Sequence, residues 1–150
     1  MRSNPLLEKL RAGQVCLGLA NMYPASGIIE GMCRGWDFVW IDAQHGEMSY
    51  DSCLGALQAA QAAGVHTLLR VPGHEACVLG VFADLAPDAI MVPMVNSADE
   101  ARRIVRALRF APLGCRSYGG RRVIDLFGRE YYRDQGVMIV AQIETLEGLD

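Results

Sequence analysis

Stretches of continuous hydrophobic residues alternate along the chain with longer stretches in which hydrophobic residues recur every three or four positions. The first kind of stretch predicts strands that are covered on both faces, as in a parallel sheet. The second kind predicts amphipathic helices. Strands are expected at residues 15–21, 38–44, 66–72, 89–95 and 137–144.

Helices are expected between these strands, at residues 25–35, 49–64, 74–86 and 97–111. The last of them opens with Ser97 and has Glu100 three residues later, which is the pattern of a capping box. Gly35 and Gly64 are typical of helix ends, where the backbone often turns into a left-handed conformation. The chain therefore reads as a series of strand–helix units.

The spacing of the strands favours one architecture. The first four strands begin roughly two dozen residues apart, which is the length of one βα unit, so we predict an α/β fold, a (β/α)8 TIM barrel. An open doubly wound sheet is the alternative; its dinucleotide-binding form requires GxGxxG after the first strand, where this chain reads LANMYPASG. A whole barrel needs eight strands and typically about 250 residues. We therefore expect residues 1–150 to form the first five or so βα units of one longer domain.

Composition excludes several functions. The chain is 51% hydrophobic and 21% charged with a formal net charge of -3, and its basic residues form no tract that would favour nucleic acid or an anionic membrane surface. It has no signal-peptide pattern and no run of about 18 apolar residues, which favours a cytoplasmic protein. The five cysteines fit neither a disulfide framework nor a CxxC metal site, so we expect reduced, mostly buried thiols.

Polar side chains stand where the predicted strands end. In a barrel these ends meet at one face, where active sites form. The candidates at or just after these ends are Asp42, Gln44, His45, Arg70, Gln142 and Glu144.

Each candidate also has a simpler explanation. His45 at a strand end is often only a surface residue, but a carboxylate nearby would suit it to general-base work; Asp42 is close in sequence, and Asp84 could approach only through the fold. Arg70 interrupts an apolar strand and needs an anion, so an ion pair with Asp42 or Asp84 is as strongly indicated as a bound ligand. Glu144 could ligate a hard divalent cation or cap the next helix.

The segment at residues 112–122, PLGCRSYGGRR, is rich in Gly and Arg. An anion-contacting loop and a solvated turn explain it equally well. His66 begins a predicted strand, at the opposite end from the candidate site, and is expected to be structural.

The segments FVWIDAQHG, LLRVP, AIMVPMV, PLGCRSYGG and AQIET, in this order, resemble the HpcH/HpaI family of class II pyruvate aldolases over essentially all 150 residues. The resemblance implies a barrel enzyme that cleaves a 4-hydroxy-2-oxo acid or a 2-keto-3-deoxy sugar acid to pyruvate and an aldehyde. It implies a divalent metal ion (Mg, Mn or Co) that stabilises a pyruvate enolate, and assembly as a homo-oligomer. A citrate-lyase-like acyl-CoA lyase and a non-catalytic keto-acid-binding barrel are the alternatives.

The resemblance also assigns residues around the metal. It implies that Glu144 is a metal ligand and that Gln142 contacts the substrate. A second metal carboxylate is expected about one βα unit after Glu144, beyond residue 150. Position 44 is Gln where several family members carry Glu, while other members carry Gln.

Roles follow for the remaining candidates. The resemblance implies that Arg70 stabilises charge developing on the keto oxygen. His45, acting directly or through a metal-bound water, would take the hydroxyl proton in the cleavage direction. Asp84 would raise the basicity of His45, and Asp42 would help to hold the water network.

Overall fold

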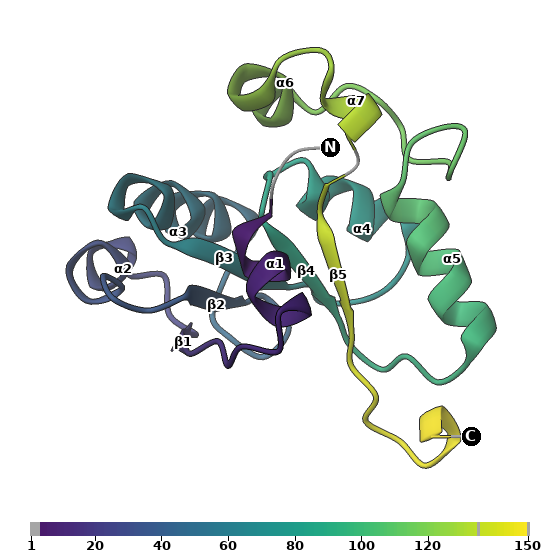
Figure 1. Cartoon of the computed structure of the whole chain (residues 1–150), viewed down its shortest axis with the longest axis horizontal. Helices are drawn as coiled ribbons and strands as arrows, with labels where there is room; N and C mark the ends of the chain where they lie inside the picture. The colour runs from purple at the N-terminus through teal and green to yellow at the C-terminus, as the bar shows by residue number, and fades with distance from the viewer. Residues whose placement is uncertain (1–3, 135, 150) are drawn as a thin grey trace.

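The computed structural model describes residues 4–134 and 136–149, and its centre is a parallel sheet in the order β1–β2–β3–β4–β5 (Figure 1). Each strand pairs in parallel with the one before it in the sequence. This sequential order is that of a barrel, whereas a doubly wound sheet reverses its strand order. The strands are β1 (Gly18–Asn21), β2 (Phe38–Asp42), β3 (His66–Arg70), β4 (Ala89–Val92) and β5 (Met138–Ala141).

The α/β class and all five predicted strands are confirmed, each strand lying inside its hydrophobic run. The four predicted helices are confirmed as α2 (Ser26–Met32), α3 (Tyr50–Ala63), α4 (Ala76–Ala83) and α5 (Ala98–Leu108).

The helix end predicted at Gly64 is formed, whereas α2 ends at Met32 with Cys33 as its C-cap, two residues before Gly35. Gly64 is the C-cap of α3 at φ 74°, and the Ser97 hydroxyl accepts a hydrogen bond from the Glu100 N–H at 3.2 Å. The reciprocal bond of the capping box goes elsewhere, because the Glu100 carboxylate accepts from the Asn96 N–H at 2.8 Å. The Ser97 and Glu100 side chains thus each accept one backbone N–H at the start of α5.

Three helices were not predicted: α1 (Pro5–Arg11), α6 (Arg121–Phe127) and α7 (Tyr131–Asp134). The short 3-10 helix η1 (Glu147–Leu149) follows Glu144, where the next helix was expected. The sequence does carry a signal for α1, because Asn4 caps it and Pro5 occupies the first turn. Helix α6 begins inside the Gly- and Arg-rich segment, which was predicted as a loop.

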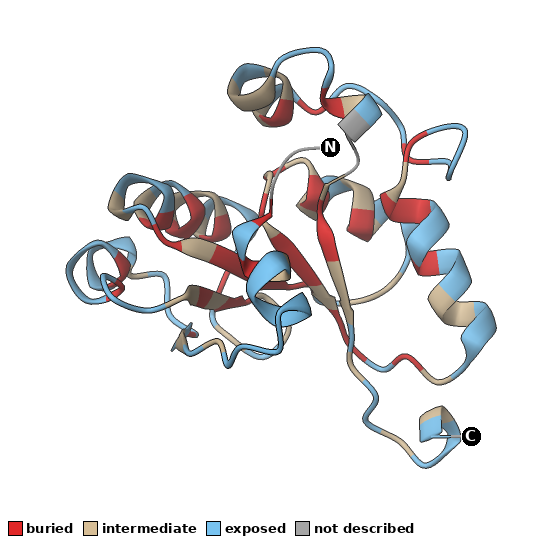
Figure 2. Cartoon of the chain, in the orientation of Figure 1, coloured by how far each residue is buried: buried red, intermediate tan, exposed pale blue. Residues whose placement is uncertain are grey.

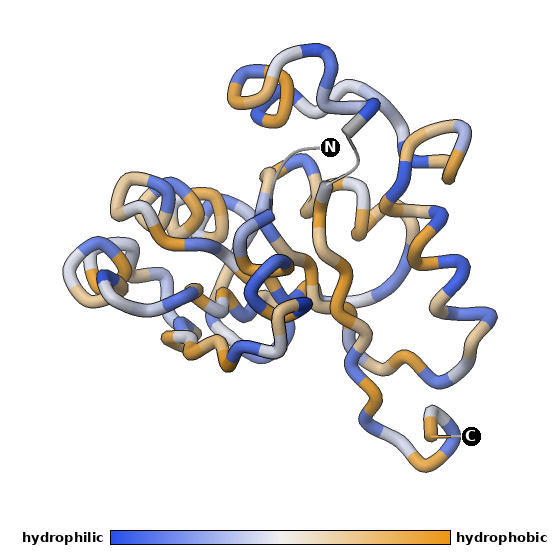
Figure 3. The backbone as a smooth tube through the Cα atoms, in the orientation of Figure 1, coloured by the Kyte–Doolittle hydropathy of each residue, from blue (hydrophilic) through white to orange (hydrophobic). Residues whose placement is uncertain are grey.

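The two faces of the sheet pack against different partners because side chains alternate along each strand. One face carries Val39, Ile41, Leu69 and Ile90, which pack against α2 to α5. Burial in Figure 2 and hydropathy in Figure 3 follow this division, with the buried, hydrophobic side of α5 turned toward the sheet.

The other face would be the interior of a barrel. It carries apolar side chains that pack with Leu6 and Leu7 of α1, which lies over the sheet in Figure 1. The strand residues of this inner face are Phe38, Trp40, Leu68, Ala89, Met91, Met138 and Val140.

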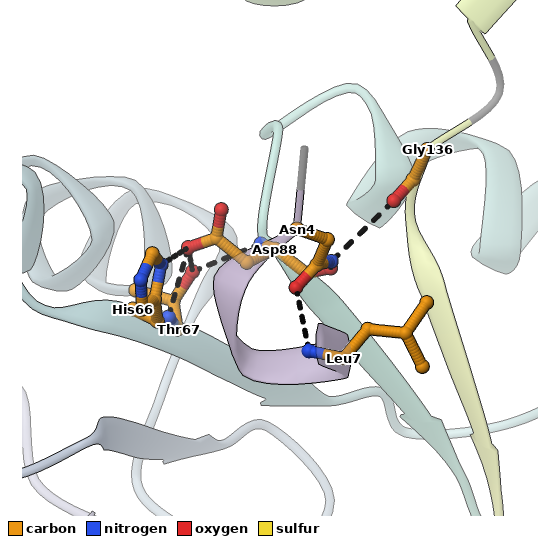
Figure 4. A network of polar contacts seen from close by, with 6 residues as sticks. All are labelled: Asn4, Leu7, His66, Thr67, Asp88 and Gly136. Atoms are coloured by element: carbon orange, nitrogen blue, oxygen red, sulfur yellow. Dashed lines mark hydrogen bonds and ion pairs between the residues drawn. The ribbon is translucent and has the colours of Figure 1, made fainter. Parts of the chain in front are cut away.

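Helix α1 is held at the amino ends of the strands (Figure 4). The Asn4 side-chain amide donates to the backbone oxygens of Asp88, at 2.9 Å, and Gly136, at 3.4 Å. Asp88 also receives hydrogen bonds from Thr67 and lies 3.5 Å from Nδ1 of His66. His66 thus belongs to a structural network at this end.

Two expectations from the sequence concern membrane-spanning helices and the burial of the cysteines. Across residues 4–134 and 136–149, no helix is both long and apolar enough to cross a membrane. All five cysteines are free, and only Cys33 and Cys53 are buried, while Cys77 and Cys115 are exposed. The prediction of mostly buried thiols is therefore wrong, because Cys16 and Cys115 lie in loops and Cys77 lies on the surface of α4. Burial raises the pKa of the Cys53 thiol to about 11.

Candidate functional site

An ion pair joins the carboxyl ends of β2 and β3. The parallel register aligns Asp42 with Arg70, and the Arg70 guanidinium binds Asp42 through two nitrogens: Nε donates to Oδ1 at 2.9 Å and Nη2 donates to Oδ2. Both side chains are almost fully buried, with 9% and 4% of the arginine and aspartate side chains exposed. The geometry is the bidentate arrangement that makes arginine–carboxylate pairs strong and directional.

The same guanidinium lies over an aromatic ring. Its central carbon is 5.0 Å from the centre of the Trp40 ring, and Trp40 precedes Asp42 by two residues on the same strand face. Nη1 is the guanidinium nitrogen that has no protein partner within the described residues. Arg70 is therefore held by a carboxylate and an aromatic ring, with Nη1 left for a ligand.

Asp42 also shapes the loop that carries His45. Its Oδ1 accepts hydrogen bonds from the backbone N–H groups of Gln44, at 3.0 Å, and His45, at 3.2 Å, which is the geometry of an Asx turn. A Cβ at Gly46 would lie 2.3 Å from the Asp42 backbone oxygen, so only glycine fits this tight turn. His45 is exposed, and its imidazole makes no hydrogen bond or ion pair within the described chain.

The electrostatics of Asp42 favour its charged form. Burial alone would raise the pKa of this carboxyl, but the hydrogen bonds from Arg70, His45 and Gln44 outweigh burial and place the pKa below its ordinary value of 3.8. Asp42 is therefore ionised at neutral pH and can serve as the counter-ion of Arg70.

Because the pKa of Asp42 is lowered in the folded state, the free energy of unfolding decreases at low pH. The contribution of Asp42 is fully present above pH 3.8 and is lost as the pH falls through its lower folded-state pKa. Between these limits, Asp42→Asn should flatten the dependence of the unfolding free energy on pH by up to about 1.4 kcal/mol per pH unit. Urea unfolding at a series of pH values measures this slope; equal slopes in the two proteins would contradict the assignment.

Glu144 and Gln142 follow the carboxyl end of β5. The exposed Glu144 carboxylate is oriented by the Met94 N–H, which donates to its Oε2 at 2.9 Å. The backbone of Gln142 continues the sheet, accepting from Val95 N–H at 3.1 Å. Its side-chain oxygen is buried without a hydrogen-bond partner in the described part of the molecule, as is that of Gln44. These unpartnered oxygens suit a donor or a cation supplied from outside.

The residues present fit part of a hard-cation site. Carboxylate and amide oxygens are the ligands that Mg²⁺ and Mn²⁺ accept, and Glu144 and Gln142 provide one of each. No cluster of three or more His, Cys, Asp or Glu side chains suited to a metal exists among residues 4–134 and 136–149. The described chain therefore supplies only part of a coordination shell.

Asp84 is held by a different partner from the one its predicted role requires. It is the C-cap of α4, and its carboxylate accepts from Nη2 of the buried Arg116 at 2.6 Å. No bond joins Asp84 to His45 within the described residues. A Cβ at Gly120 would lie 2.4 Å from the Asp84 carboxyl carbon, so the loop before α6 closes tightly over this ion pair.

The Gly- and Arg-rich segment has a structural role. Arg116 is buried against the Phe110 ring, 4.7 Å from its centre. Arg121 pairs with Asp125 at 2.6 Å, and Arg122 donates to the backbone oxygen of Leu85 and to Gln61, both at 2.9 Å. Each arginine already has a protein partner, which gives the segment a structural role beyond that of a solvated turn, and contact with an anion stays a prediction.

The structure thus brings Asp42, Arg70 and the His45 loop together and leaves Asp84 with Arg116. Two participants escaped the sequence analysis. Trp40 was considered only as part of a hydrophobic run, and Gly46 was not considered. Both lie in the motif WIDAQHG. The signal for Trp40 was its position two residues before the polar strand end, which places the ring on the same face as Asp42.

A sequential parallel α/β sheet with an ion-paired arginine and a polar loop at its carboxyl edge defines a barrel-type chain whose site lies at the strand ends. Residues 25–150 match the family model described as HpcH/HpaI aldolase/citrate lyase. The chain belongs to this family, as its motifs predicted.

Similar proteins agree with this assignment. The chain is 36% identical to a 4-hydroxy-2-oxovalerate aldolase of Novosphingobium aromaticivorans, over 98% of this chain and 58% of that protein. It is 30% identical to a 2-keto-3-deoxy-L-rhamnonate aldolase of Escherichia coli O1:K1, over 99% and 58%. An HpcH/HpaI aldolase/citrate lyase family protein of Burkholderia cenocepacia J2315 superposes with a TM-score of 0.89 at 28% identity, over 99% of this chain and 62% of that one. The chain thus spans about 58% of the length of these two relatives.

Proposed function

We propose that the protein containing this chain is a metal-dependent pyruvate aldolase. It cleaves a 4-hydroxy-2-oxo acid or a 2-keto-3-deoxy sugar acid to pyruvate and an aldehyde. Family membership and the aldolase names of the relatives support this proposal. The observation that carries it is the Arg70 guanidinium, fixed by Asp42 at the carboxyl edge beside the His45 loop with Nη1 unpartnered among the described residues.

Arg70 stabilises the negative charge that develops on the keto oxygen when the aldol bond breaks. A donor that is already oriented pays no reorganisation cost during the reaction, which is why fixed groups are effective in this role. Asp42 supplies the orientation through its two bonds to the guanidinium. The ion pair is therefore both a structural element and part of the machinery.

His45 takes the proton of the substrate hydroxyl. Its imidazole is exposed at the carboxyl edge, and its backbone is fixed by the Asx turn, so the side chain can approach a substrate held at Arg70. A bound divalent ion would supply Lewis-acid polarisation of the keto acid, and Glu144 would hold it from this chain, while Gln142 contacts the substrate. Asp84 as a partner that raises the basicity of His45 stays a prediction.

The reaction itself is tested by pyruvate release. The full-length protein is incubated with 4-hydroxy-2-oxo acids and 2-keto-3-deoxy sugar acids, and pyruvate is measured by coupling to lactate dehydrogenase. Release should require Mg²⁺, Mn²⁺ or Co²⁺, stop after chelation and return when metal is restored. Full activity after exhaustive chelation contradicts metal dependence, and turnover only of CoA thioesters supports an acyl-CoA lyase instead.

Glu144→Gln tests the metal ligand of this chain. The variant keeps the size of the side chain and its bond from Met94 but removes the charge, so the metal concentration for half-maximal activity should rise about tenfold or more. Glu147→Gln is the matched control, because Glu147 is exposed three residues later on η1. A metal requirement that changes equally in both variants would remove Glu144 from the site.

A homo-oligomer, a cytoplasmic location and a single longer barrel domain also stay predictions. Size measurement of the full-length protein in solution tests the first of these.

A further inference from the structure

We propose that Trp40 is a positioning residue for Arg70, holding the guanidinium in the plane in which it meets the substrate oxygen. This inference rests on the proposed aldolase function, and it assigns a role to a residue that the mechanism above leaves unused. Trp40 acts through Arg70 and need not touch the substrate.

The contacts of Arg70 divide the restraint between two residues. Asp42 binds Nε and Nη2, which fixes one edge of the planar guanidinium. An edge contact alone leaves the plane free to rotate about the axis through the carboxylate. The guanidinium carbon also lies over the Trp40 ring, 5.0 Å from its centre, and this second contact restricts the rotation. The carboxylate and the ring together therefore restrict the direction of Nη1.

Trp40 acts through the face of its ring and not through its indole N–H. The indole Nε1–H is buried and has no acceptor in the described residues, although a buried tryptophan usually donates this hydrogen bond. The ring is placed by packing in the inner-face cluster, with Leu68 and Met91 among its members. Arg70 lies over the ring and does not accept from the N–H.

A purely structural role as a filler of the barrel interior is the competing explanation. Phe38 offers a matched comparison, because it lies two residues earlier on β2, on the same face and in the same cluster. The Phe38 ring packs beside the Gly18 backbone, where a Cβ would lie 2.4 Å from the ring, whereas the Arg70 guanidinium lies over Trp40. Replacing Phe38 removes interior packing and leaves the guanidinium untouched.

The test compares Trp40→Leu, Trp40→Phe and Phe38→Leu in the full-length protein, at a temperature well below each melting point. Trp40→Leu should lower kcat about tenfold with little change in KM, because it weakens an interaction made in the transition state. Trp40→Phe keeps a ring face without the unpartnered N–H and should retain most of the activity. Phe38→Leu should lower the melting temperature and leave kcat unchanged.

A double-mutant cycle and a spectroscopic signal complete the test. In an Arg70→Ala background, Trp40→Leu should cause no further loss of kcat. The Arg70 Nε–H proton should show a ring-current shift in the wild type and in Trp40→Phe that disappears in Trp40→Leu. Unchanged kcat in Trp40→Leu, or an equal loss in Phe38→Leu, overturns the proposal. A wild-type protein that releases no pyruvate refutes the aldolase function instead, and the proton shift still decides whether Trp40 restrains Arg70.

Discussion

Arg70→Ala is expected to lose both stability and activity. The substitution leaves the Asp42 carboxylate buried without its counter-ion, and breaking a buried pair in this way lowers the free energy of unfolding by about 3–5 kcal/mol. Asp42 keeps its two backbone donors, so we expect the lower part of this range. Pyruvate release should fall about 10²–10³-fold, because one fixed donor to a developing oxyanion contributes that much.

Urea unfolding and pyruvate release measure the two effects separately. Arg121→Ala is the control, because Arg121 forms an exposed ion pair with Asp125, and such pairs contribute about 0–1 kcal/mol. Arg70→Lys retains a positive charge and should recover part of the stability but little of the activity, since an ammonium group does not reproduce the bidentate geometry. Equal stability of Arg70→Ala and Arg121→Ala would refute the buried pair.

His45→Ala is expected to have its main effect on turnover. A positioned general base contributes about 10²–10⁴-fold to the rate, and His45 is exposed with no partner for its imidazole in the described chain. We therefore predict a loss of kcat in this range with nearly unchanged stability, measured by pyruvate release and thermal unfolding.

His66→Ala is the control for this prediction. His66 lies near Asp88 at the amino end of β3, away from the candidate site. Its loss should lower the melting temperature and leave kcat unchanged. Retention of at least a third of wild-type kcat in His45→Ala would argue against His45 as the base.

The fold was largely predictable because local patterns determine it. Hydrophobic runs set the five strands, and Ser97 and Gly64 mark helix ends by local hydrogen bonding and backbone geometry. Helix α6 was missed because it has seven residues and lacks a side-chain cap at Gly120. Tertiary contacts of Arg122 hold it, and such contacts carry no periodic signal.

The sequence predicted which residues form the site better than it predicted which of them form ion pairs. Strand ends indicated Asp42, Arg70 and Glu144, and the parallel register confirmed that Asp42 and Arg70 are neighbours. The pairing of Asp84 with Arg116 was not readable, because these residues are 32 positions apart and meet only when the loop before α6 folds back. The predicted roles of Asp84, Gln142 and Glu144 stay predictions, and Glu144→Gln tests the last of them.

The sequential strand order has a consequence for synthesis on the ribosome. Every strand of this sheet needs only its immediate predecessor as a template, so each newly emerged βα unit can add to those already formed. Helix α1 is the exception, because Asn4 reaches backbone oxygens 84 and 132 residues further along. Helix α1 therefore acquires the anchor at Gly136 only after the chain has been made as far as the fifth strand.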